Sequence, residues 1–151
     1  MVGRFPTGVI VASVRSPDGP RLMTANSFTS VSLEPPLVLI CVELTARFHQ
    51  AVLTAGEWGV SVLAADQEEV SRAYARRSVL DGIPTAAHRL GPHTGAPLLD
   101  GAVAQLECRT VAEHPGGDHT IVVGAVLDAV VSRTGIGPLL YHQGRYGGSV
   151  G

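Results

Sequence analysis

The sequence has little charge and no long apolar run, and each of these shortages excludes a class of protein. Only 16% of the 151 residues are charged and the net charge is -2, so no basic field exists to attract nucleic acid or an anionic membrane. No apolar stretch approaches the roughly 20 residues that a membrane helix needs, and the N-terminus lacks the pattern of a signal peptide. We therefore expect a protein that binds neither nucleic acid nor a membrane.

Cysteine is also scarce. The two cysteines, Cys41 and Cys108, lie in apolar, strand-like segments and have no CxxC partner. Their spacing is typical of neither a disulfide scaffold nor a metal site. They are predicted to be reduced core residues of a cytoplasmic protein.

The signatures of common nucleotide, hydrolase and metal sites are missing as well. No GxGxxG opens a helix and no GxxxxGK[ST] loop occurs, so a nucleotide would bind without either of these phosphate-binding motifs. The spacing of Ser, His and Asp does not indicate a hydrolytic triad. No metal site is expected, because no HExxH or comparable spacing links the histidines His88, His93, His114, His119 and His142.

What remains is a β-rich chain with the composition of one compact domain, residues 1–151. Hydrophobic residues make up 45% of it, which is typical of a globular protein with a sizeable core. Turn signals such as "SPDGP" and "HPGGD" separate β-branched or apolar runs and predict hairpins. The runs that predict strands cover residues 8–14, 36–43, 58–63, 102–114 and 119–132.

Three of these strands carry further information. The run 36–43, "PLVLICVE", is apolar at nearly every position, which predicts a strand covered on both faces. The run 102–114 alternates, with Ala104, Leu106 and Cys108 on one face and polar residues on the other. The run 119–132 is too long to be flat, and Gly124 predicts a bend or bulge within it.

Two helices are predicted between the strands. In "TARFHQAVLTAG", Thr45 is the expected N-cap and Gly56 the expected end, with an apolar stripe from Phe48 to Ala55. In "DQEEVSRAYARR", residues 66–77, Asp66 is the expected cap with Glu69 three residues on.

Glycine and proline punctuate residues 78–98 too often for regular structure, so a long surface loop is predicted there. The end of the chain, "GPLLYHQGRYG", is predicted to form one short strand and a glycine-rich tail. Strands joined mostly by hairpins, with helices placed irregularly between them, favour a mainly β fold: a closed antiparallel β-barrel with flanking helices. A Rossmann sheet is disfavoured.

The hydroxyl-rich stretch "TANSFTSVS" directly precedes the most apolar strand. In an extended segment, Thr24, Asn26, Ser30 and Ser32 would share one face, and such a face suits a flat polar heterocycle. The alternative is that Ser and Thr merely populate an edge strand and its turn.

The stretch that follows the same strand could bind an anion. Thr45, Ala46 and Arg47 open a helix after Glu43, so free backbone N–H groups, a hydroxyl and a guanidinium would converge there. This arrangement predicts a phosphate site. The alternative is an ordinary capped helix with a solvated arginine.

The order of these motifs resembles the flavin reductase domain family, the small NAD(P)H-dependent reductase components of two-component flavin-dependent monooxygenases. The matching segments are "FPTGVIVAS", "TANSFTSVSLEPPLVLICVE", "TARFHQAV", "WGVSVLAADQEEVSRAYA", "PLLDGAVAQLECRTVAEHPGGDHTIVVGAV" and "PLLYHQGRYG", and together they span nearly the whole chain. The resemblance implies a Greek-key FMN-binding split barrel and a homodimer with flavin at the subunit interface. Only four residues precede Phe5, fewer than is usual in the family, so we expect altered dimer packing or cofactor cover at that end.

The resemblance also assigns roles to residues. FMN or FAD would be the flavin, NADH or NADPH the hydride donor, and a flavin-dependent monooxygenase the partner. His119 of the "GDH" motif would be the catalytic residue beside the nicotinamide, together with Tyr141, Arg145 and Tyr146. The flavin would be held by Thr7, Gly8, Thr24, Ala25, Asn26, Ser27, Ser32, Cys41, Val42, Glu43, Thr45, Ala46 and Arg47.

Two other functions are compatible with the same fold. One is a module that stores flavin or senses its redox state without reductase turnover, and the other is a flavin-dependent oxidase. The "GDH" and "YHQGRY" motifs favour the reductase, because the family uses them around the nicotinamide.

Overall fold

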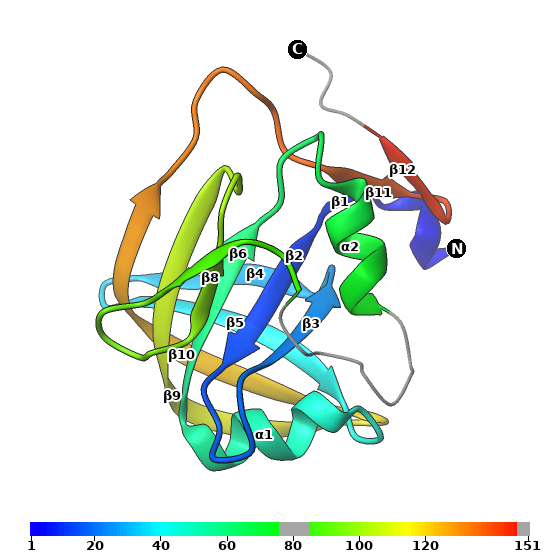
Figure 1. Ribbon diagram of the computed structural model, residues 1–151. Helices are drawn as coiled ribbons and strands as arrows, with labels where there is room; N and C mark the ends of the chain where they lie inside the picture. Colours follow the sequence, from blue (N-terminus) through cyan, green and yellow to red (C-terminus); the bar gives the residue numbers. More distant parts are fainter. Residues whose placement is uncertain (76–84, 148–151) are drawn as a thin grey trace.

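A computed structural model describes residues 1–75 and 85–147 of the chain. Its main feature is a strongly curved antiparallel sheet of seven strands, which wraps into a barrel (Figure 1). The strand order is β3-β2-β6-β9-β10-β5-β4. These strands are β2 (Ile10–Val14), β3 (Arg21–Ala25), β4 (Phe28–Leu33), β5 (Pro36–Glu43), β6 (Glu57–Val62), β9 (Ala104–Gly116) and β10 (His119–Val131).

Smaller elements surround the barrel. A three-stranded sheet contains β1 (Thr7–Gly8), β11 (Leu140–His142) and β12 (Arg145–Gly147), and a two-stranded one contains β7 (His88–Leu90) and β8 (Pro97–Leu99). The helices are a short 3-10 turn (Val2–Arg4), α1 (Arg47–Ala55) and α2 (Glu68–Ala75). Within the described residues, no helix is long and apolar enough to cross a membrane.

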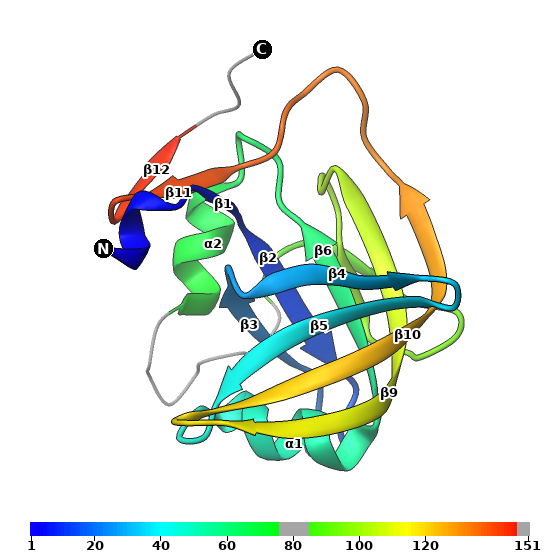
Figure 2. The ribbon, with the colours of Figure 1, turned by 180° about the vertical axis from the view of Figure 1, so that it is seen from behind.

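The interior of the barrel is the main hydrophobic core. Inward-facing residues of five strands meet there around Trp58, which is fully buried. Helix α1 covers one end of the barrel (Figures 1 and 2) and contributes Phe48 and Val52 to the same core. The fold is therefore mainly β with flanking helices, as predicted.

A second apolar cluster lies on the outer side of the sheet. It joins Val11 and Leu22 of the hairpin β2–β3 to Tyr74 of α2, Leu99 of β8 and Leu139 before β11. The Tyr74 hydroxyl accepts hydrogen bonds from the backbone N–H groups of Thr85 and Ala86, both at 3.0 Å. This cluster fastens α2 and the small sheets to the barrel.

Of the three residues predicted to begin or end a helix, only Gly56 is confirmed. Gly56 ends α1 in the left-handed region with φ 69°, as expected, but Thr45 is not the cap, because Ala46 holds that position without a side-chain bond. Helix α2 begins at Glu68, so Asp66 lies too early to cap it. Asp66 instead pairs with Arg133 at 2.8 Å, and this ion pair lowers the pKa of the Asp66 carboxyl.

Two predicted segments contain more structure than expected. The predicted loop 78–98 contains β7 and most of β8, and Ala96 and Leu98 within it are buried. Its residues 78–84 lie outside the described part of the chain. The end of the chain forms two strands, β11 and β12, rather than one. In both places short apolar runs find partners that local sequence does not reveal.

Strand β5 differs from the prediction in a way that bears on function. Val38, Ile40 and Val42 face the core and are buried, whereas the alternate residues Leu39 and Cys41 are half-buried on the outer face. The strand is therefore covered on one face only. Cys41 is a free cysteine outside the core, while Cys108 is free and buried as expected; burial and the nearby Glu107 charge raise the pKa of the Cys108 thiol to about 12.

Gly124 forms the predicted irregularity in β10. The pairing of β10 with β9 shifts register between Val123 and Gly124, and Gly124 lies against the indole ring of Trp58. A Cβ at this position would come within 2.5 Å of Trp58 Cζ2. The glycine is thus required by the packing of the largest core side chain.

We expect Gly124→Ala to lower the free energy of unfolding by about 1–3 kcal/mol, the usual cost of forcing extra volume into a packed core. Urea unfolding would measure the change. Gly147→Ala is the matched control, because a Cβ on this strand glycine meets nothing within 4 Å. Equal stability of the two variants would contradict the packing argument.

Candidate functional site

A cavity of about 460 Å³ lies on the outer side of the barrel, beside β5. Its walls come from residues 5–10, residues 26–29, Leu39, Cys41 and Val62. This volume is within the range of small-molecule sites. The exposed apolar face of β5 is therefore the floor of a pocket.

The corner at Asn26–Ser27 shapes one wall of this pocket. Strands β3 and β4 are the two edges of the seven-stranded sheet, and only these two residues connect them. The Ser27 hydroxyl donates to the Cys41 carbonyl at 3.0 Å and accepts from the Cys41 N–H at 3.1 Å. Ser27 thereby fixes the corner against β5 and sets the position of Asn26.

The N-terminal strand supplies the opposite wall. Among the described residues, Thr7 Oγ1 is buried without a hydrogen-bond partner, although it lies beside the cavity. Gly8 follows it, and a Cβ there would meet nothing within 4 Å. The pocket wall thus contains a buried hydroxyl without a partner in the described part of the chain, and open space lies beside Gly8; both features suit a polar ring edge.

The β5–β10 register extends the same outer face beyond the cavity. Ile121 is opposite Cys41, and His119 is opposite Glu43, so His119 lies one pleat further along the face that contains Cys41. His119 Nδ1 lies 2.7 Å from Asp118 Oδ1. This hydrogen bond, together with the charge of His119, lowers the pKa of Asp118, and it leaves Nε2 as the ring nitrogen that can meet a ligand.

The remaining predicted flavin residues are distributed around the fold. The stretch "TANSFTSVS" is not one extended segment, so the predicted single polar face is wrong. The chain must bend at Asn26–Ser27 to pass from one edge of the sheet to the other. Thr24 does not share a face with the residues after this bend, and its hydroxyl donates to the Ser71 carbonyl of α2 at 2.7 Å. Ala25 and Val42 pack on the core, and Ser32 is opposite Leu37, near the far end of β4.

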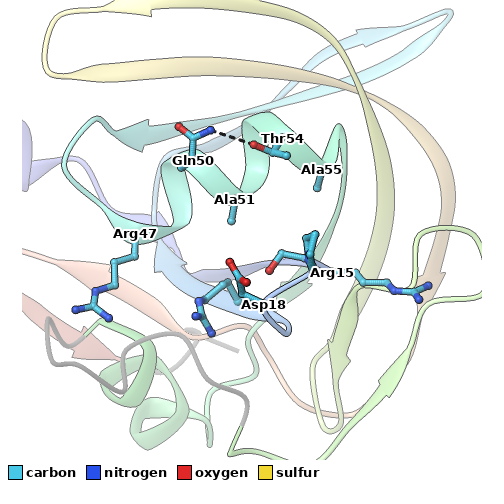
Figure 3. A pocket seen from close by; sticks show the side chains of 10 residues that line it. Arg15, Asp18, Arg47, Gln50, Ala51, Thr54 and Ala55 are labelled. Atoms are coloured by element: carbon cyan, nitrogen blue, oxygen red, sulfur yellow. Dashed lines mark hydrogen bonds between the residues drawn. The ribbon is translucent and has the colours of Figure 1, made fainter.

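Arg47 lies at a second cavity, of about 660 Å³, between α1 and the β2–β3 turn (Figure 3). Figure 3 shows Gln50, Ala51 and Thr54 of α1 on one side of it and Asp18 of the turn on the other. Arg15 and Arg21 also line it. The structure therefore separates Arg47 from the cavity that gathers Thr7, Gly8, Asn26, Ser27 and Cys41.

Tyr141 and Tyr146 lie next to each other in the small sheet, with ring centroids 5.2 Å apart. Tyr141 is opposite Thr7, so this sheet adjoins the first cavity through β1. The Tyr146 hydroxyl is 2.7 Å from Ser71 Oγ, and the Arg72 guanidinium lies 4.9 Å from the Tyr146 ring centre. Arg145, opposite His142 in the same hairpin, is exposed.

Sequence reasoning missed the apolar walls of the first cavity. Phe5, Phe28, Leu39 and Val62 line it, and none of them was expected at a site. The sequence did contain a signal for Leu39. Strand β5 is apolar on both faces although only one face enters the core, which indicates that its outer face has an apolar contact of another kind.

A family model, the flavin reductase like domain, matches residues 2–149. The chain belongs to the flavin reductase family. It is 48% identical over 149 residues to the "NADH-dependent FAD reductase" of Streptomyces globisporus, covering 95% of this chain and 80% of that one. It is 40% identical to "FMN reductase (NADH) SmoA" of Agrobacterium fabrum, covering 97% and 81%.

A solved structure agrees with this assignment. The structure of BorF, the flavin reductase component of a bacterial two-component tryptophan halogenase, superposes with a TM-score of 0.89 at 44% identity, covering 97% of this chain and 92% of that one. The barrel described above is thus the split barrel of the flavin reductase family.

The open space at Gly8 allows the pocket to be tested separately from the fold. We expect Gly8→Val to leave the melting temperature almost unchanged, since a Cβ there meets no atom within 4 Å. Flavin affinity should fall about tenfold or more, because a side chain forced into an occupied pocket costs about 1–3 kcal/mol. Fluorescence titration with FMN and FAD measures this, and Gly147→Val in the same small sheet is the control. Undiminished affinity in the folded Gly8→Val variant would exclude this cavity as the flavin site.

Proposed function

We propose that the chain transfers a hydride from NADH to FMN or FAD in the cavity beside β5 and releases the reduced flavin to a partner flavin-dependent monooxygenase. The observation that carries this proposal is the pocket itself, which gathers five of the residues assigned to flavin from three separate segments. Support for the chemistry comes from relatives named as NADH-dependent FAD and FMN reductases. Support for a partner comes from BorF, named as one component of a two-component halogenase.

The pocket residues fit a flavin ring. Leu39, Phe28 and Val62 offer an apolar wall for its flat face, and the unpartnered Thr7 hydroxyl offers a hydrogen bond to its polar edge. The Asn26 amide can donate and accept at the same edge. When bound, flavin accepts the hydride, so this chain has only to bind, align and release its two ligands.

His119 is proposed as the residue that contacts the nicotinamide. It shares the outer face of β5–β10 with Cys41, one pleat from the cavity. Its hydrogen bond to Asp118 fixes the ring orientation. His119 would orient the nicotinamide through Nε2, and Tyr141 beside Thr7 would extend the same binding surface.

The second cavity is proposed to hold phosphate groups. Three arginines, Arg15, Arg21 and Arg47, and one acidic residue, Asp18, are among the residues that line it. Arg47 is the first residue of α1, and a basic residue beside the backbone N–H groups at the start of a helix favours phosphate. We therefore still propose that Arg47 binds phosphate, with Thr45 and Ala46 beside it in the chain.

A homodimer in the cytoplasm is proposed as the working form. Two large apolar side chains are exposed: Phe5, which lines the first cavity, is 74% exposed, and Leu33, at the far end of β4 from that cavity, is 89% exposed. Exposed apolar groups of this kind mark interaction surfaces. Two free cysteines fit a reducing compartment.

The experiment that tests the proposal is anaerobic mixing of the purified protein with NADH and excess FMN or FAD. We expect the visible absorbance of the oxidised flavin to disappear over many turnovers, since the product is released. Binding of flavin without its reduction would instead favour a storage or sensing module. Absence of both binding and reduction would refute the assignment, and NADPH in place of NADH would establish the donor preference.

For His119→Ala we expect kcat/KM for NADH to fall about tenfold at saturating flavin, with flavin affinity nearly unchanged, because the lost contact belongs to the second ring. Steady-state kinetics with NADH varied would measure it. His114→Ala is the control, an exposed histidine of the same β9–β10 hairpin. Wild-type kinetics in His119→Ala would show that the nicotinamide is held elsewhere.

A further inference from the structure

Three side chains outside both cavities form a cluster of possible metal ligands. They are His93 of the loop between β7 and β8, Glu107 of β9 and Asp128 of β10. One ligand atom from each lies within 4.8 Å of the other two. None of the three lines the proposed flavin or phosphate cavity.

The two carboxylates of this cluster are held against each other by the sheet. Glu107 and Asp128 are direct partners across the β9–β10 ladder, and a register shift between Val126 and Asp128 produces this pairing. Like charges directly opposite each other destabilise a sheet, and bulges often direct side chains into sites. Because Glu107 is only 2% exposed, water offsets little of this repulsion at the Glu107 carboxylate.

The surrounding loop satisfies one oxygen of Glu107 and leaves the other without a partner. Oε1 accepts from His93 N–H at 3.0 Å, Thr94 N–H at 2.9 Å and Thr94 Oγ1 at 2.8 Å. Gly91 permits this close wrapping, since a Cβ there would collide with the Glu107 carboxylate. Among the described residues, Oε2 is buried and has no hydrogen-bond partner, so a half-satisfied buried carboxylate faces a second carboxylate.

We propose that His93, Glu107 and Asp128 bind one divalent transition-metal ion. His93 Nε2 and Asp128 Oδ2 are 3.9 Å apart, too far for a hydrogen bond. Ligands about 2.1 Å from a tetrahedral zinc ion are about 3.4 Å from each other, so the ligand atoms, which lie within 4.8 Å of one another, would have to move together by at most about 1.4 Å. One imidazole with two carboxylates suits Zn²⁺, Co²⁺ or Mn²⁺, whereas the imidazole disfavours Mg²⁺.

The metal would be structural. It would join the β7–β8 loop to β9 and β10 while neutralising the Glu107–Asp128 pair. His93 and Asp128 are 51% and 42% exposed at their side chains, which gives the ion an entry path and leaves a coordination position for water. The sequence analysis expected no metal site, because these ligands come from three segments and form no recognisable motif.

Zn²⁺ titration of the chelator-treated protein by calorimetry tests this site. We expect one ion per chain with micromolar or tighter affinity, no comparable heat with Mg²⁺, and a melting temperature raised by about 5 °C or more at saturating Zn²⁺. Co²⁺ should give the visible absorption of a coordinated ion. Absence of saturable binding in the micromolar range would overturn the proposal.

Variants identify the ligands. His93→Gln and Asp128→Asn change half-exposed side chains, so they should fold and should each weaken Zn²⁺ binding at least about tenfold. His88→Gln, a histidine of β7 outside the cluster, should bind as the wild type does. Unchanged affinity in both ligand variants would place any bound zinc elsewhere. Flavin reduction should persist in all three variants, so the result is independent of the proposed function.

Discussion

The fold depends on one local constraint: the seven-stranded sheet is linked edge to edge by only two residues, Asn26 and Ser27. A sheet that curls this tightly leaves unpaired backbone groups at the corner. The Ser27 hydroxyl pairs with both backbone groups of Cys41 and so replaces the missing ladder bonds. The same pairing fixes the pocket wall to the pocket floor, which means that barrel closure and ligand site share one set of hydrogen bonds.

Strand β5 connects the core to the site. Its inward residues Val38, Ile40 and Val42 belong to the hydrophobic core, while Leu39 and Cys41 on the outer face line the cavity. A ligand on that face therefore rests on a strand whose other face is immobilised by packing. Rigid support of this kind is what the proposed alignment of two stacked rings requires.

The sequence predicted what local patterns determine. Strand 36–43, the end of α1 at Gly56 and the bulge at Gly124 all follow from neighbouring residues and were found. The predicted cap Asp66 was wrong, because Asp66 has a distant partner, Arg133, that no local pattern reveals. At the site, the resemblance named Thr7, Ser27 and Cys41, but the corner that brings them together, and the separation of Arg47 from them, depend on strand register across the barrel.

The outer surface of the barrel explains why the first cavity lies beside β5. On β2, β6 and β9 the outer face carries polar side chains that are buried beneath the β8 segment. There Ser13 donates to the Pro97 carbonyl, and Ser61 accepts from the Leu99 N–H. That face is thus filled by the chain itself. On β5 the outer face is apolar and no strand of the described chain covers it, so it remains open as the floor of the first cavity.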